Sequence, residues 1–159
     1  MKVKTGLGQD SHRFEASPSG KPLILGGIHF EDCPSLEGNS DADVVLHALV
    51  NALTGVHGTV VLGPVTDKLC KAGVTDSREY VRAALKHLRA GTLSHVSVSL
   101  ECKRPAIGPK IDAIRLSLAD LLSLRTADVA VTAHSGEGLT AFGRGEGVAA
   151  TVLVTAVEE

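Results

Sequence analysis

The sequence predicts a single-domain α/β (α+β) protein, with a mixed sheet of four to five strands and helices packed on one face. Segments with alternating apolar residues are interleaved with segments of helical periodicity along the chain. The 159 residues suit one domain. Because the chain has no Trp, one Tyr and three Phe, its core must be built from aliphatic side chains, which suit close-packed α/β layers. We therefore expect residues 1–159 to form one domain.

The first third of the chain predicts two strands and a helix. Residues 2–9 alternate as a strand, and Pro22–Phe30 predicts a second strand with a bulge or kink at Gly26-Gly27. After a polar loop, a helix is expected over Asp43–Thr54, opened by the polar run 39–41 and closed by Gly55. Residues 56–75 are rich in Gly and Val and predict irregular structure.

The rest of the chain predicts two more helices and three strands. Asp76 starts a helix with a capping-box pattern to Glu79, and Gly91 ends it. Pro109 suits the first turn of the third helix. The expected strands are 96–102, 129–133 and the apolar segment that follows the Gly-rich loop ending at residue 147. Since this last strand is apolar almost throughout, another subunit is expected to cover its second face.

Charge and cysteine content limit the function classes. A net charge of −2 and a pI near 6.4 argue against a partner that is nucleic acid or a membrane surface. Cys33, Cys70 and Cys102 are odd in number and form no CxxC, so neither a disulfide framework nor a thiolate metal site is indicated. Free thiols, and a start at MKVKTGLGQD without a signal-peptide core, predict a cytoplasmic protein.

Three residues carry the strongest chemical signal. Asp10 and His12 are two positions apart in a predicted strand and so leave the same face of it, while His47 lies about one turn inside the first predicted helix. Two imidazoles and one carboxylate are the ligand set of a catalytic zinc that keeps one position open. Such a metal polarises carbonyl or phosphoryl oxygens. A capping Asp and two ordinary polar histidines are the alternative.

Several motifs occur in a specific order over nearly the whole chain. They are Asp10-Ser11-His12, the LILGG run from Leu23, SDAD-x-x-LHAL over Ser40–Leu49, Thr75-Asp76-Ser77, and GLTAFGRGEG over Gly138–Gly147. In this order and spacing the sequence resembles the 2-C-methyl-D-erythritol 2,4-cyclodiphosphate synthase family of the non-mevalonate isoprenoid pathway. The resemblance implies a homotrimer with active sites between subunits, and a zinc held by Asp10, His12 and His47.

The resemblance also implies a reaction. The family's substrate is a cytidine diphosphate ester of methylerythritol with a 2-phosphate. That phosphate attacks the β-phosphorus, CMP leaves, and a cyclic diphosphate forms. Zinc positions the diphosphate, and Mg²⁺ or Mn²⁺ bridges its α and β oxygens. The protein then mainly orients two phosphates and shields their charge, as phosphoryl transfer requires.

Further site residues follow from the match, position by position. The catalytic candidates are Ser135, a hydroxyl beside the cytidine phosphates, and Glu137, the carboxylate of the second metal. His134 either contacts phosphate or joins a second metal site, and Arg144 either pairs with Glu146 at an interface or binds an anion. The expected substrate-binding positions are Asn39, Ser40, Gly63, Ala106, Ile107, His134 and Arg144. Ser40 can present its backbone N–H to a phosphate at a helix start.

The chain departs from the family pattern where the nucleotide would bind. Four residues differ from those that the family usually has. Asn39 replaces a His, and Val61 replaces an Asp that contacts the ribose. Ala106 replaces a Lys of the cytosine-binding segment, and Thr132 replaces another Lys. One lost charge-assisted hydrogen bond costs about 1.5–3 kcal/mol. The alternatives to a synthase are thus a divergent, non-cyclising homologue that binds zinc and a phosphate or isoprenoid diphosphate, and, with less support, a different zinc hydrolase.

Overall fold

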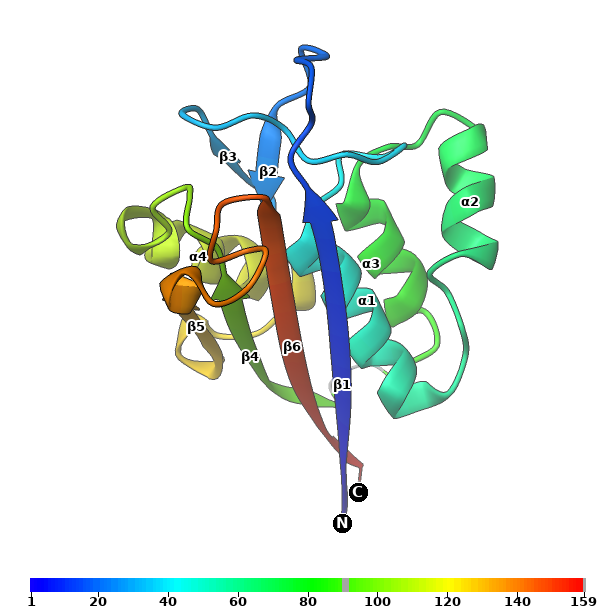
Figure 1. The fold of residues 1–159 in the computed structure, drawn as a ribbon. Coiled ribbons are helices and arrows are strands. Elements are labelled where there is room, and N and C mark those ends of the chain that lie inside the picture. The colour runs from blue at the N-terminus through cyan, green and yellow to red at the C-terminus, as the bar shows by residue number, and fades with distance from the viewer. Residues whose placement is uncertain (90–91, 159) are drawn as a thin grey trace.

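Four strands form the main sheet in the order β1-β6-β4-β5 (Figure 1). The computed structural model describes residues 1–89 and 92–158. The sheet contains β1 (Lys2–Arg13), β4 (Leu93–Glu101), β5 (Val129–His134) and β6 (Gly147–Glu158). β6 pairs antiparallel with β1 and β4, while β4 and β5 are parallel. The predicted mixed sheet of an α+β protein is therefore confirmed, with four strands.

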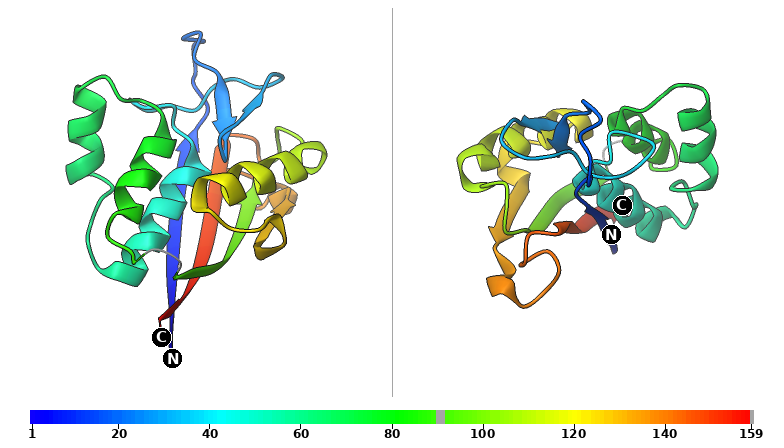
Figure 2. Two further views of the ribbon diagram at one scale, coloured as in Figure 1. Left: turned by 180° about the vertical axis from the view of Figure 1, so that it is seen from behind. Right: turned by 45° about the horizontal axis from the view of Figure 1, so that its top comes forward.

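The helices cover one face of this sheet, as predicted. They are α1 (Val44–His57), α2 (Pro64–Lys71), α3 (Ser77–Leu85) and α4 (Ile111–Leu122). α1 packs on β1 and β6, and α4 packs on β5 and makes the crossover that joins the parallel strands β4 and β5. The view from behind shows these helices in front of the strands (Figure 2). No helix in the described ranges is long and apolar enough to cross a membrane.

The Pro22–Phe30 segment is a hairpin, which corrects the prediction of one kinked strand. β2 (Leu23–Leu25) pairs antiparallel with β3 (Ile28–Phe30). Gly26 and Gly27 have φ values of 62° and 78°, so these two residues form a two-residue hairpin turn rather than a bulge. Their backbone N–H groups donate to the buried Asp43 carboxylate at 2.8 and 2.7 Å, which fixes the hairpin against the start of α1.

The boundaries of α1 also differ from the prediction. Asp43 itself is the N-cap and accepts from the backbone N–H groups of Val45 and Leu46, so the polar run 39–41 lies in the preceding loop. The helix continues through Gly55 and ends at Gly58, whose φ of 81° is left-handed. Gly55 lies inside the helix, and its lack of a side chain suits the close approach of α1 to β1, since a Cβ there would lie 3.0 Å from Gly6 Cα.

Four further features differ from the prediction. α2 lies within residues 56–75, where no helix was expected; its eight residues are too few for a clear periodic signal. α3 ends at Leu85, before Leu88, and Gly91 lies outside the described residues. Pro109 lies in a 3₁₀ turn (Gly108–Lys110) before α4 rather than in the first turn of that helix. In addition, β1 continues to Arg13, because pairing with β6 extends beyond residue 9.

The core lies between the sheet and the helices. The predicted alternation of β4 is confirmed, with Val96, Val98 and Leu100 buried. The outer face of the sheet has no helix over it in Figure 1 and leaves Val3, Leu7 and Leu153 exposed by 58%, 63% and 42%. Exposed aliphatic side chains on a sheet face are typical of a surface that contacts another protein.

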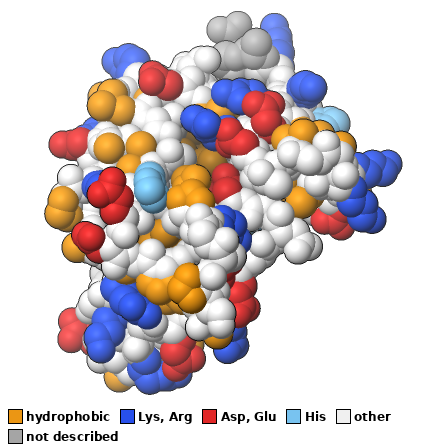
Figure 3. Space-filling model, turned by 90° about the horizontal axis from the view of Figure 1, so that it is seen from above, with side chains coloured by type: hydrophobic (Ala, Val, Ile, Leu, Met, Phe, Trp, Pro, Cys, Tyr) orange, Lys and Arg blue, Asp and Glu red, His pale blue; other side chains and the backbone are white. Residues whose placement is uncertain are grey.

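Positive and negative side chains are intermixed on the face seen from above, with hydrophobic side chains between them (Figure 3). This distribution agrees with the net charge of −2.

Candidate metal centre

The metal-ligand candidates come from one strand and one helix. Asp10 and His12 lie on the inner face of β1, two residues apart, as strand geometry requires. His47 lies one turn inside α1, where its backbone N–H donates to the N-cap residue Asp43 at 2.9 Å. α1 crosses the inner face of β1, so the sequence prediction that these three residues meet in space is confirmed.

Two glycines allow the helix to approach the strand. Gly6 and Gly8 lie on the same face of β1 as Asp10. A Cβ on Gly6 would overlap the carbonyl oxygen of Ala52, and one on Gly8 would overlap that of Ala48. The backbones of β1 and α1 are therefore in direct contact, and this contact brings His47 to the strand.

The three side chains converge on one carboxylate oxygen. Asp10 Oδ2 lies 3.1 Å from His12 Nε2 and 3.1 Å from His47 Nδ1. The ligand atoms all lie within 4.8 Å of one another. Zinc ligands at about 2.1 Å in a tetrahedral arrangement are roughly 3.4 Å apart, which is close to the two separations of 3.1 Å from the Asp10 oxygen. These residues can thus supply three ligands to one metal ion.

The electrostatics of the cluster favour a charged carboxylate. Burial opposes ionisation of Asp10, but hydrogen bonds and charge from His12 and His47 outweigh it and lower the pKa of this carboxyl. The hydrogen bond to Asp10 is the main cause that raises the pKa of His12, against partial burial. Asp10 is therefore ionised near neutral pH, which is the form that binds a metal ion.

In each histidine, the ring nitrogen that does not face Asp10 lies close to a hydrogen-bond acceptor. His12 Nδ1 lies 2.6 Å from the carbonyl oxygen of Glu37, and His47 Nε2 lies 2.9 Å from Ser77 Oγ. Ser77 Oγ in turn donates a short hydrogen bond to Asp41 Oδ1. Metal-binding histidines commonly donate their second N–H to such an acceptor, which fixes the orientation of the ring.

A cavity of about 440 Å³ opens at the three ligands. Of the predicted substrate-binding positions, Asn39, Ser40 and Gly63 line it. Sequence reasoning missed the contribution of α2, because residues 56–75 were predicted to be irregular. The helix that starts after Asp76 was predicted, but not its contact with this site. The additional lining residues from this part of the chain are Leu62, Thr66, Asp67, Cys70, Lys71 and Tyr80.

The other predicted site residues lie at the opposite edge of the sheet. Ser135 and Glu137 are exposed in a 3₁₀ turn after β5, where Ser135 Oγ accepts from Glu137 N at 3.2 Å. β1 and β5 are separated by β6 and β4, which corresponds to three strand spacings, or roughly 14 Å. Within one chain, these two candidates are therefore not brought to the metal ligands.

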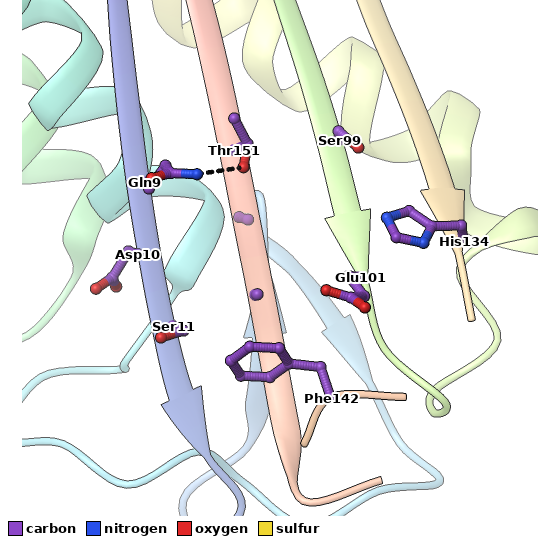
Figure 4. A pocket seen from close by; sticks show the side chains of 10 residues that line it. Gln9, Asp10, Ser11, Ser99, Glu101, His134, Phe142 and Thr151 are labelled. Carbon is purple, nitrogen blue, oxygen red and sulfur yellow. Dashed lines mark hydrogen bonds between the residues drawn. The ribbon is translucent and has the colours of Figure 1, made fainter. Parts of the chain in front are cut away.

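His134 lines a separate hollow of about 470 Å³ on the outer face of the sheet (Figure 4). Glu101 and Phe142 point into the same hollow, and Gln9 donates to Thr151 across β1 and β6. Asp10 lines both this hollow and the metal cavity, so the strand that carries it separates the two spaces.

The remaining candidates lie apart from the metal cavity. Arg144 is exposed, and its Nε donates to Glu146 at 3.0 Å. Ala106 is exposed, whereas Ile107 is buried in the core, with 4% of its surface exposed. The Gly143–Gly147 run forms turns that lead into β6.

The comparisons with known proteins agree with this fold. The sequence model of the YgbB family matches residues 3–157. A curated relative, the 2-C-methyl-D-erythritol 2,4-cyclodiphosphate synthase of Chlamydia muridarum, is 45% identical over 157 residues, covering 98% of this chain and 88% of the relative. The matches therefore extend over almost the whole chain.

Solved structures of similar fold also align with almost the whole chain. The bifunctional IspDF from Campylobacter jejuni aligns with a TM-score of 0.86 at 28% identity, over 98% of this chain and 42% of that one. A 2C-methyl-D-erythritol-2,4-cyclodiphosphate synthase in its CDP-bound form aligns with a TM-score of 0.80 at 31% identity, over 95% of this chain and 98% of the other.

Proposed function

The chain belongs to the YgbB family, and we propose that it acts as a 2-C-methyl-D-erythritol 2,4-cyclodiphosphate synthase. It would convert 4-diphosphocytidyl-2-C-methyl-D-erythritol 2-phosphate to the 2,4-cyclic diphosphate and CMP, in non-mevalonate isoprenoid biosynthesis. The observation that carries this proposal is the Asp10–His12–His47 cluster, which opens onto one cavity in a chain 45% identical to a named synthase.

Zinc is the metal proposed for this cluster, because two imidazoles and one carboxylate leave a fourth position open for a substrate oxygen. When bound, zinc supplies Lewis-acid polarisation of a phosphoryl oxygen. Asp10, His12 and His47 would hold it. Lys71 lines the same cavity and offers an ammonium group to the phosphate charge, and Ser40 offers a backbone N–H.

The reaction forms one phosphorus–oxygen bond and breaks another. An oxygen of the substrate's 2-phosphate attacks the β-phosphorus, and the bond to CMP breaks with its electron pair remaining on CMP. The chain's residues hold these two phosphates in line and keep their charges apart, which is the main requirement of phosphoryl transfer. Ser135 is the proposed hydroxyl beside the diphosphate, and Glu137 the proposed ligand of a Mg²⁺ or Mn²⁺ ion that accompanies it.

A homotrimer would unite these two groups of residues. Ser135 and Glu137 follow β5, whereas the metal ligands lie on β1 and α1, at the other edge of the sheet. Packing of the outer sheet faces of three chains would bury Val3, Leu7 and Leu153, and could bring Glu137 of one chain to the His47 of its neighbour. A cytoplasmic location is proposed as well, because all three cysteines are free thiols in the structure.

The test is direct. Purified protein with zinc and Mg²⁺ should release CMP from the cytidyl substrate, together with the cyclic diphosphate detected by ³¹P NMR. The matched control is Asp10→Asn, which keeps the shape of the side chain but weakens its metal binding. No CMP release above this control at high enzyme concentration would reject the synthase proposal.

One observation favours the second candidate, a non-cyclising homologue. Val61, which stands at the position of the family's ribose-contacting Asp, is fully buried and so offers no polar group to a ribose. A homologue of this kind would bind zinc and a phosphate or isoprenoid diphosphate without binding cytidine. Calorimetry with CDP distinguishes the two, because tight binding of CDP argues for the synthase and against this homologue.

A further inference from the structure

The imidazole of His47 has a different partner at each nitrogen. Nδ1 lies 3.1 Å from Asp10 Oδ2, on the side where a metal ion would bind. Nε2 faces away from this point and lies 2.9 Å from Ser77 Oγ and 3.4 Å from Ser40 Oγ. Ser77 is the nearer of the two hydroxyls. The tautomer of His47 therefore depends on which of the two atoms, Ser77 Oγ or His47 Nε2, donates the hydrogen bond between them.

The contacts of Asp41 determine which atom is the donor. Its Oδ1 accepts a short hydrogen bond from Ser77 Oγ, and its Oδ2 accepts from the backbone N–H of Ser77 at 3.0 Å. A serine hydroxyl has one proton to donate. Since Asp41 takes it, Ser77 Oγ can only accept from the second partner, which is the Nε2–H of His47.

We propose that Ser77 and Asp41 are positioning residues that hold His47 as the Nε2–H tautomer and direct its Nδ1 lone pair at the metal. This inference rests on the metal centre of the proposed function, and assigns a role to two residues outside the ligand set. We call the hydrogen-bonded series His47–Ser77–Asp41 the relay. Asp41 lies in the loop before α1 and Ser77 is the first residue of α3, so the relay connects these two segments to one candidate ligand.

Burial makes the relay difficult to replace by solvent. Ser77 is fully buried and His47 is 8% exposed. The ring of Tyr80, one turn further along α3, lies 6.0 Å from the ring of His47. A hydrogen bond in such surroundings is stronger than in water, and loss of one partner leaves the other unsatisfied.

The second histidine shows the same arrangement. His12 has a ligand nitrogen, Nε2, facing Asp10, and its Nδ1 lies 2.6 Å from the carbonyl oxygen of Glu37. There the acceptor belongs to the backbone, and no side-chain substitution removes it. At His47 the acceptor is a side chain, which makes this half of the site testable by mutation.

The test measures zinc affinity, not turnover. In Ser77→Ala, competition with a chromophoric chelator should show zinc binding weakened by about 10- to 100-fold, the usual effect of losing such an outer partner. Ser77→Thr keeps the hydroxyl and should restore most of the affinity. The matched control is Asp76→Ala, which removes the N-cap of α3 next to Ser77 but has no contact with His47, and should lower thermal stability while zinc affinity stays unchanged.

A second variant covers the case in which Ser77→Ala does not fold. Asp41→Asn keeps the size of the side chain but removes the charge that draws the Ser77 proton, and should also weaken zinc binding. In the zinc-loaded wild type, ¹⁵N NMR should show a proton on Nε2 of His47. Unchanged zinc affinity in the folded variants, or a proton on Nδ1, overturns the proposal. Neither readout uses CMP release, so failure of the synthase proposal is seen separately.

Discussion

Asp10 is the residue at which the two candidate metal-binding histidines converge. One of its oxygens is 3.1 Å from both His12 and His47, and their hydrogen bonds keep its pKa low despite burial. The direct packing of β1 against α1 holds the three ligand atoms close to one another. The cluster is therefore largely preorganised, and each ligand should be essential for binding.

Replacement of His47 by Ala should empty the site. The variant loses one of the three ligand groups and leaves Asp10 and His12 with too few bonds to retain zinc through dialysis. Elemental analysis should find zinc in the wild type and only traces in His47→Ala. Equal zinc content in the two proteins would contradict the assignment of the ligands.

His57, the last residue of α1, is a histidine outside the metal centre whose pKa is also shifted. Its Nδ1 accepts from Thr59 N at 3.0 Å, and its buried Nε2 has no hydrogen-bond partner among the described residues. The ring of His87 lies 5.2 Å away. Burial first, and the charge of His87 second, lower the pKa of His57.

This lowered pKa predicts a loss of stability in acid. Because His57 takes up a proton more readily in the unfolded chain, its contribution is complete above the unfolded pKa of about 6.5 and decreases as the pH falls through that value. The melting temperature should therefore fall as the pH drops below about 6.5, and His57→Gln should make this fall shallower. His87→Gln should have a smaller effect, since burial remains. An unaltered pH profile in His57→Gln would refute the prediction.

At the level of elements, the contact between β1 and α1 determines the site. Gly6 and Gly8 let the helix backbone touch the strand, so that His47 reaches Asp10. The carboxylate of Asp43 joins the same helix to the β2–β3 hairpin through four backbone N–H groups, and burial raises its pKa to about 6. The position of α1 is thus set at both its start and its middle.

Gly8→Ala should damage both stability and metal binding. The added Cβ forces α1 away from β1, which should lower the free energy of unfolding by about 1–3 kcal/mol and move His47 from Asp10. Urea denaturation and zinc titration measure the two effects. Gly108→Ala is the matched control, because a Cβ at that position meets nothing within 4 Å. Similar losses in both variants would show that the close approach is not the cause.

At the level of the whole molecule, the proposed trimer would account both for the uncovered sheet face and for the separation of Ser135 and Glu137 from the candidate metal ligands. The helices cover one face only, and the other face presents aliphatic side chains from β1 and β6. The hollow in Figure 4 lies on this face, between the strands that carry Asp10 and His134.

Leu7→Glu should disrupt assembly. Leu7 is 63% exposed in the single chain, so the charge is tolerated by the monomer but opposes burial between chains. Light scattering after gel filtration should show a trimer for the wild type and a smaller species for the variant. Leu116→Glu is the control, since Leu116 is exposed on α4, on the helix side of the sheet. A trimer of unchanged stability in Leu7→Glu contradicts this interface.

Subunit mixing tests whether each site uses two chains. His47→Ala and Glu137→Ala proteins should each lack activity, but co-refolded mixtures should regain part of it, because some mixed trimers contain a site with an intact His47 beside an intact Glu137 from the neighbour. CMP release from the mixture is the measurement. No recovery in trimers shown by mass spectrometry to be mixed would contradict a shared site.

The sequence by itself determined the mixed sheet, the family resemblance and which three residues are the candidate metal ligands, because residue type, alternation and motif order are local properties. It gave one kinked strand in place of the β2–β3 hairpin, because strands of three residues are too short to show an alternation on either side of Gly26-Gly27. It missed α2 because a helix of eight residues gives a weak periodic signal. The tertiary structure alone decided that Asp41 and Ser77 lie behind His47 and that Ser135 and Glu137 lie far from it. Those relations depend on which strands and helices pack together, and no local pattern encodes such distances.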